Sequence, residues 1–213
     1  GVKLQDDIHP TLDGSREITV LDPDGNEVQF TEYNKTGEGM LMLSDDDDHG
    51  VCSMAKYTTQ VAYQIKDGIN MRNFYCKGLG MKLVKTITMG DLCDAMAQGG
   101  QMDERALMGM RMMAKEPWLD YIEIAPHQYL ELFYAPGQPK KEERNLQPYY
   151  GFQHICLEVT DIQASWDAVI ANGITPDTEI SLGADGAYQF WLVDPEGNRL
   201  ELMEYAQGAM QLL

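Results

Sequence analysis

Positive charge is scarce in this sequence: 16 Lys and Arg stand against 34 Asp and Glu, for a formal net charge of −18 at pH 7. Nucleic acids and anionic membranes are bound by Lys and Arg that neutralise phosphate, so we expect neither as a partner. No apolar run approaches the roughly 18 residues of a membrane-spanning helix, and no signal-peptide pattern is present at the start of the chain.

Cysteine is scarce as well. The four cysteines are Cys52, Cys76, Cys93 and Cys156, and they form no CxxC pair and no closely spaced set. The disulfide framework of a small secreted domain is therefore not expected. Together with the missing signal-peptide pattern, this predicts a cytoplasmic protein.

The chain does contain enough apolar sequence for a core, since 44% of its 213 residues are hydrophobic. It also repeats a pattern: DPDGNEVQFTEY (22–33) and DPEGNRLELMEY (194–205) are identical at six of twelve positions. Asp-Pro opens a turn and Gly-Asn tolerate positive φ, so each copy predicts a β-hairpin. The second copy has Glu201 where the first has Gln29.

A second pair of similar segments lies between these copies. QVAYQIKD (60–67) and HICLEVTD (154–161) alternate like strands, and each is followed by a segment typical of a helix. Asp67 and Asp161 are the expected N-caps, and glycines such as Gly173 are the expected helix ends. Further strand-like sequence follows each helix, so each unit predicts strand–helix–strand–strand–strand.

We therefore predict an α+β fold in which two βαβββ modules, with curved and mostly antiparallel sheets, pair around a central cleft. The predicted divisions are an N-terminal hairpin and acidic linker at 1–50, a first module at 51–140 with a Met-rich insertion at 89–117, and a second module at 141–213. The insertion can serve as adaptable packing or as a mobile lid.

Four polar residues occupy matched places in the two modules. Gln60 and His154 open the first strands, while Glu131 and Glu201 lie in the last strands between leucines, so each Glu faces away from its leucines. Buried carboxylates are costly unless they are paired or bound to metal. Taken singly, each residue could be structural. Taken together, one amide, two carboxylates and one imidazole predict a site for Zn²⁺, Ni²⁺, Co²⁺ or Mn²⁺.

Three stretches resemble the vicinal oxygen chelate superfamily, which includes glyoxalase I, extradiol dioxygenases, methylmalonyl-CoA epimerase and the bleomycin and fosfomycin resistance proteins. They are NFYCKGLGMKL (73–83), HICLEVTD (154–161) and DPEGNRLEL (194–202). The Gln, Glu, His, Glu set is most similar to that of eukaryotic-type glyoxalase I, whereas the dioxygenases show two His and one Glu. The resemblance thus implies that Gln60, Glu131, His154 and Glu201 bind one divalent metal ion.

The resemblance also implies a glyoxalase-like lyase or isomerase that acts on an α-hydroxycarbonyl or a thiol hemithioacetal through an enediolate. Glu201 would be the principal base and Glu131 its partner. The glutathione adduct is not the expected substrate, because the places that hold its carboxylates in glyoxalase I carry Gln64, Ala135 and Tyr150 here. We expect a homodimer, with the modules paired either within one chain or between two.

Other functions stay open at this point. The chain could be a small-molecule binding or resistance protein of the same fold without turnover, or a related epimerase or dioxygenase. The N-terminal copy lacks both the Glu and a preceding strand–helix half, so we expect it to form an extra strand pair at a sheet edge or a dimer contact. Cys156 shares a strand face with His154, and we expect it to be a small buried residue.

Overall fold

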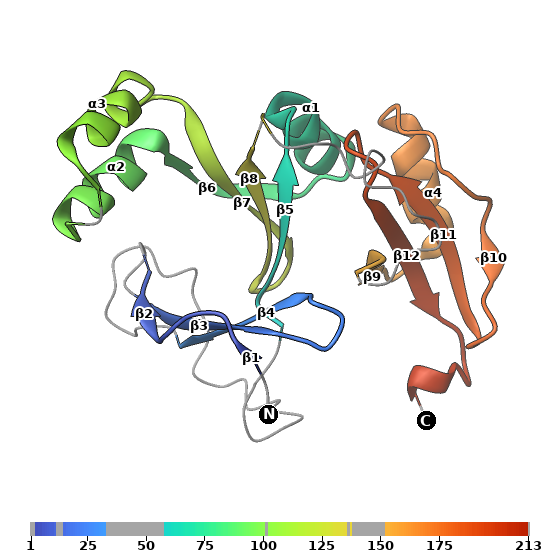
Figure 1. Ribbon diagram of the computed structural model, residues 1–213. Helices are drawn as coiled ribbons and strands as arrows, with labels where there is room; N and C mark the ends of the chain where they lie inside the picture. Colours follow the sequence, from blue (N-terminus) through green and yellow to red (C-terminus); the bar gives the residue numbers. More distant parts are fainter. Residues whose placement is uncertain are drawn as a thin grey trace.

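The computed structural model describes residues 3–11, 15–32, 58–100, 102–135, 137 and 152–212. In this part the chain forms three four-stranded sheets (Figure 1). None of the helices described there is long and apolar enough to cross a membrane. Several sequence predictions lie outside the described residues: the acidic stretch 43–50, Cys52, most of the connection at 137–150, and Tyr150.

Module one contains one sheet and one helical segment. Its elements are β5 (Gln60–Ile65), α1 (Gly68–Arg72), the π-helical turn η1 (Asn73–Gly78), β6 (Lys82–Thr88), β7 (Pro117–Ala125) and β8 (Gln128–Tyr134). The strand order is β5-β8-β7-β6, and β5 is parallel to β8. Asp67 caps α1 by accepting a hydrogen bond from the Asn70 N–H, as predicted.

Module two repeats this arrangement. Its elements are β9 (His154–Glu158), α4 (Ile162–Ala171), β10 (Ser181–Leu182), β11 (Ala187–Val193) and β12 (Arg199–Tyr205), followed by the 3-10 helix η3 (Met210–Leu212). The strand order is β10-β11-β12-β9 with β9 parallel to β12, so the two sheets have the same connectivity. Asp161 caps α4 through the Ala164 N–H. The predicted α+β fold of paired βαβββ modules is therefore confirmed.

The leucine faces of both sheets contribute to one hydrophobic core. Leu130 and Leu132 of β8 lie in it together with Leu200 and Leu202 of β12, and residues of α1, η1 and α4 complete it. Side chains alternate between the two faces of a strand. The glutamates between these leucines therefore lie on the sheet faces that are turned away from the shared core.

The DPEGN turn between β11 and β12 joins the two modules. Glu196 Oε1 accepts hydrogen bonds from the backbone N–H groups of Lys66, at 2.8 Å, and Asp67, at 2.7 Å. Asp194 Oδ2 accepts a hydrogen bond from Tyr75 Oη at 2.9 Å, within the protein interior. The turn thus supplies acceptors to the corner between β5 and α1.

We expect Glu196→Ala to lower the free energy of unfolding by about 1–2 kcal/mol, because two backbone donors lose their acceptor. Asp24→Ala is the matched control, since Asp24 occupies the same place in the exposed N-terminal copy of the turn. Urea unfolding monitored by fluorescence measures both variants. Equal losses in the two variants would show that the Glu196 contacts do not hold the modules together.

The turn between β7 and β8 is shorter than the DPEGN turn, because Ala125 still pairs with Gln128 and only Pro126 and His127 lie between the strands. Five residues, 124–128, nevertheless separate the paired Glu123 and Tyr129, just as 194–198 separate Val193 and Arg199. His127 has φ +60° in this turn, where the DPEGN turn has Gly197 at φ +88°. The sequence IAPHQ hides this equivalence because it lacks the DPxGN residues.

The N-terminal segment forms the third sheet, from β1 (Lys3–Leu4), β2 (His9–Pro10), β3 (Arg16–Leu21) and β4 (Glu27–Glu32). The predicted hairpin is present as β3–β4, and its Asp22 accepts from the Asp24 and Asn26 N–H groups as Asp194 does from Glu196 and Asn198. The expectation of an added strand pair at a sheet edge was wrong. Because β1 and β2 pair with β3, the hairpin builds its own sheet.

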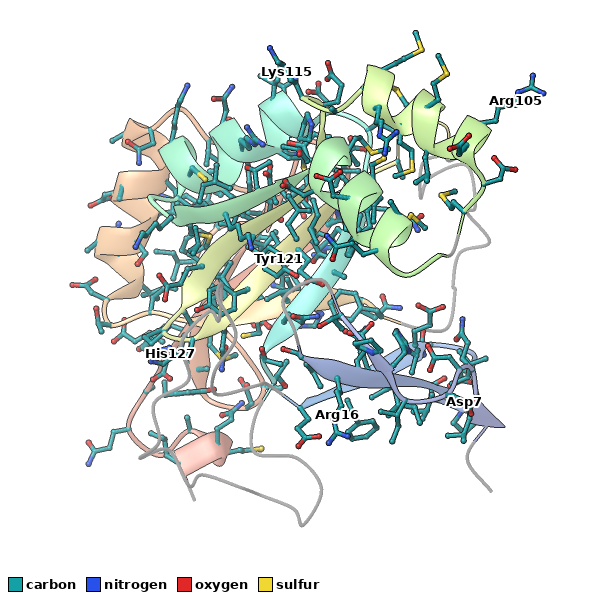
Figure 2. All side chains as sticks on the ribbon, turned by 90° about the vertical axis from the view of Figure 1, so that its left-hand side faces the viewer. Asp7, Arg16, Arg105, Lys115, Tyr121 and His127 are labelled. Carbon is teal, nitrogen blue, oxygen red and sulfur yellow. The ribbon has the colours of Figure 1, made fainter. Side chains whose placement is uncertain are left out.

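The Met-rich insertion folds into two helices, α2 (Met89–Gln98) and α3 (Glu104–Met112), between β6 and β7. Met110 packs with Cys93 and Leu107 in a small core of their own. Met108 and Met112 are 66% and 83% exposed, and Arg105 projects away from the sheets (Figure 2). Packing therefore accounts for only some of these methionines, and a lid role stays a prediction.

Candidate functional site

Two of the predicted site residues meet on module two. The parallel register of β9 and β12 sets Cys156 opposite Glu201, with His154 two residues earlier on the same strand face. His154 Nε2 lies 3.3 Å from Glu201 Oε2, and the two side chains are 35% and 9% exposed. The His154 ring also contacts the Trp191 ring edge-on, with centroids 4.7 Å apart. The imidazole is thus fixed beside a nearly buried carboxylate.

Cys156 lies beside this pair. It is exposed, so the expectation of a buried residue was wrong. Partial burial of the thiol still raises the pKa of Cys156 to about 12, and the Glu201 carboxylate adds to the rise. The thiol therefore lies next to the Glu201 carboxylate, opposite it in the register of β9 and β12.

The other two predicted residues lie together on module one. Glu131 is opposite Ala62 in the parallel register of β5 and β8, and Gln60 is two residues before Ala62. This offset matches that of His154 and Glu201. Glu131 is only 4% exposed, and Gln60 Nε2 donates a 3.0 Å hydrogen bond to Gln29 Oε1 of β4. β4 lies beside the start of β5 in Figure 1, so this pair faces the N-terminal sheet.

The structure therefore places the four residues as two pairs at equivalent positions, and it does not assemble them into one site within the chain. Among the described residues, no three His, Cys, Asp or Glu side chains lie close enough together to hold a metal ion. The common core of the two modules explains this, because it faces the leucines and directs Glu131 and Glu201 away from the joint.

The distance between His154 and Glu201 is suited to two side chains that bind the same divalent cation. Nitrogen and carboxylate ligands lie about 2.0–2.2 Å from Zn²⁺, which puts two of them roughly 2.8–3.6 Å apart in a tetrahedral or octahedral site. The observed 3.3 Å is within this range. An imidazole and a carboxylate also suit Ni²⁺, Co²⁺ and Mn²⁺.

A buried charge network on module one had no clear signal in the sequence. Asp120 of β7 is completely buried and accepts hydrogen bonds from Arg72 Nη2 at 2.7 Å, Thr86 Oγ1 at 2.6 Å and Tyr134 Oη at 2.8 Å. A second contact from Arg72 Nε makes the pair bidentate. Asp120 lies opposite Leu132, on the core side of the sheet, so the network serves the fold and not the site.

Comparison with known proteins gives a consistent picture. A sequence model of the Glyoxalase/Bleomycin resistance protein/Dioxygenase superfamily matches residues 58–202. This range contains all four predicted site residues. No curated protein matches the chain.

Solved structures share the fold at low sequence identity. Two mutants of glyoxalase I from Zea mays are 19% identical, with TM-scores of 0.58 and 0.59; the alignments cover 96% of this chain but only 59% and 60% of theirs. A glyoxalase family protein from Enterococcus faecalis is 20% identical over 70% of this chain and 98% of its own, with a TM-score of 0.50. The alignments to the maize structures extend over nearly the whole chain and so take in the N-terminal sheet.

Proposed function

Because the chain belongs to the Glyoxalase/Bleomycin resistance protein/Dioxygenase superfamily, we propose that it is a metal-dependent lyase or isomerase of the glyoxalase type. Its substrate would be an α-hydroxycarbonyl or a thiol hemithioacetal. The observation that carries the proposal is the His154–Glu201 pair, 3.3 Å apart on the sheet face turned away from the core. Family membership alone would not distinguish an enzyme from a binding protein.

The four residues divide the work between the two modules. Gln60, Glu131, His154 and Glu201 would hold the metal ion, which when bound supplies Lewis-acid polarisation of the substrate oxygens. The Glu201 carboxylate is nearly buried, so it is poorly solvated and suited to take the proton next to the carbonyl. Glu131, at the same register position in module one, would return a proton to the neighbouring carbon.

We place the complete site between two copies of the chain. Within one copy the Glu131 and Glu201 faces are both turned away from the shared core, so each needs a second surface opposite it. Module one of one copy facing module two of its partner would supply all four ligands. The Gln60–Gln29 hydrogen bond has to open for this, because it occupies the Gln60 amide in the single chain.

The substrate should carry little negative charge. The net charge of −18 repels polyanions, and the positions of Gln64 and Ala135 provide no cation for a carboxylate. Thiol adducts of 2-oxoaldehydes made from neutral thiols are therefore the first compounds to screen, next to the glutathione adduct.

A second candidate function is small-molecule binding without turnover. It is favoured by one observation: among the described residues, no three His, Cys, Asp or Glu side chains are grouped closely enough to hold a metal ion. The two functions differ in the requirement for metal, since a binding protein keeps its affinity for ligand after the carboxylate is removed.

Metal analysis tests the proposal directly. Protein purified without chelator or metal column should contain about one equivalent of Zn, Ni, Co or Mn per chain, and Glu201→Ala should lose most of it, since removal of one ligand weakens such sites strongly. Glu179→Ala, at an exposed position outside the pair, is the control. Absence of metal from the wild type after reconstitution would contradict the enzyme and favour the binding protein.

A further inference from the structure

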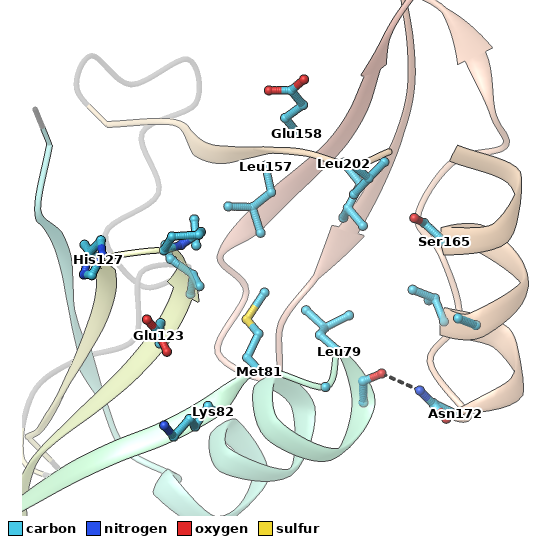
Figure 3. Close-up of a pocket in the computed structure, with 18 residues that line it drawn as sticks. Leu79, Met81, Lys82, Glu123, His127, Leu157, Glu158, Ser165, Asn172 and Leu202 are labelled. Atoms are coloured by element: carbon cyan, nitrogen blue, oxygen red, sulfur yellow. Dashed lines mark hydrogen bonds between the residues drawn. The ribbon is translucent and has the colours of Figure 1, made fainter. Parts of the chain in front are cut away.

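A pocket of about 670 Å³ lies between the two modules, on the opposite side of module two from His154 and Glu201. Leu157 and Leu202 line it, and these alternate along β9 and β12 with Cys156 and Glu201 (Figure 3). The volume is within the usual range for small-molecule sites. Because the pocket uses the other face of the sheet, it is separate from the proposed metal site.

We call the interface between the two modules the joint. One half of the joint lies at the β11–β12 turn and the other at the β7–β8 turn, and the pocket lies in the second half. In one half, Tyr63 and Tyr75 of module one stand beside the DPEGN turn, and both are buried. In the other half, Leu157 is the fourth residue of its strand, as Tyr63 is, and Val169 is eight residues past its N-cap, as Tyr75 is. Two phenol rings are thus replaced by aliphatic side chains, and these line the pocket.

The turns that face these positions also differ in polarity. Asp194 and Glu196 give the first half of the joint two carboxylates with hydrogen-bond donors opposite them. The equivalent residues of the β7–β8 turn are Ile124 and Pro126, which offer no polar side chain. One half of the joint is therefore filled and polar, and the other is open and mainly apolar.

His127 is one of the polar groups that line the open half, on the module-one side (Figure 3). Its φ of +60° is uncommon for a residue with a Cβ, and glycine stands at this place in the other two turns. In the described part of the chain the imidazole has no hydrogen-bond partner. A residue at positive φ that lines a pocket and has no hydrogen bond within the described residues is the pattern expected where a ligand is contacted.

We propose that this pocket binds a small neutral aromatic molecule with one hydrogen-bonding group, of the phenol or indole class. The ring takes the place that Tyr63 and Tyr75 fill in the other half of the joint, against Leu79, Met81 and Leu157. The polar atom of the ligand meets the His127 imidazole. The lining carries two carboxylates, Glu123 and Glu158, against one cation, Lys82, and the whole chain has a net charge of −18, so aromatic carboxylates should bind more weakly than neutral ligands.

The experiment uses the full chain in the presence of chelator, so its result does not depend on the proposed metal site. Indole is titrated into isotope-labelled protein and followed by NMR. We expect saturable shifts at Met81, Leu157 and Val169, with a Kd of about 1 mM for a ligand of this size. Benzoate at the same concentrations should cause at least about tenfold weaker saturation.

Two substitutions on α4 distinguish binding in the pocket from nonspecific binding of indole elsewhere on the protein. Ala168 is exposed and lines the pocket, so Ala168→Phe fills it without disturbing the core and should weaken indole binding about tenfold or more. Ile170 is exposed and does not line the pocket, so Ile170→Phe adds the same ring elsewhere and should leave the Kd within about twofold. Equal binding by both variants, no saturation in the wild type, or equal binding of benzoate would overturn the proposal.

Discussion

Mixing two inactive variants should restore about a quarter of the metal sites and of the activity, if the site lies between two copies. Glu131→Gln and Glu201→Gln each remove one carboxylate, and each alone is expected to lower activity by about 10²–10⁴-fold. After unfolding and refolding together, half of the dimers contain one chain of each kind. In a twofold dimer, one of their two sites then carries both substitutions and the other carries none.

The matched control replaces the Glu201→Gln chain by the Glu131→Gln/Glu201→Gln double variant. Every site then lacks Glu131, so nothing should be recovered. The measurements are high-affinity metal per chain and turnover of the substrate found in the screen. If mixed dimers form, as judged by mass, and neither signal returns, the two glutamates do not belong to one shared site.

Asp120→Ala is expected to lower the free energy of unfolding by about 3 kcal/mol. The Asp120 side chain is completely buried and is bonded to Arg72, Thr86 and Tyr134. Breaking a buried ion pair by removing one partner costs roughly 3–5 kcal/mol. We take the lower end because the Arg72 side chain is 34% exposed and regains some hydration.

Urea unfolding of three variants tests this prediction. Asp94→Ala, at an exposed position of α2, should stay within about 0.5 kcal/mol of the wild type. The double variant Asp120→Leu/Arg72→Met removes both charges and should recover most of the loss, because an apolar pair of similar size can replace a buried ion pair. A double variant as unstable as Asp120→Ala would mean that packing, and not charge, makes Asp120 important.

Local patterns predicted the fold well. Asp67 and Asp161 cap their helices as the sequence indicated, and the alternation around Glu131 and Glu201 correctly separated the leucine faces from the glutamate faces. These features depend on neighbours within a few residues along the chain.

The assembly of the modules was beyond such patterns. Gln60 could be assigned to a strand, but nothing near it in sequence indicates a hydrogen bond to Gln29, which depends on where the N-terminal sheet packs. The sequence also could not show that the leucine faces share one core, which is what holds Glu131 and Glu201 apart. The correspondence between the β7–β8 turn and the DPxGN turns was hidden because His127 takes the positive φ that glycine takes in the other two turns.

The pairing of the first strand of each module with its last has a consequence for biosynthesis. β5 cannot pair until β8 has left the ribosome, and β9 waits in the same way for β12. The Lys66 amide waits longer still, since its acceptor Glu196 is 130 residues further on. At about 5–20 residues per second this is a delay of roughly 7–26 s. Contacts so distant in sequence also slow the folding step itself, so strand edges of the nascent chain stay unpaired for many seconds.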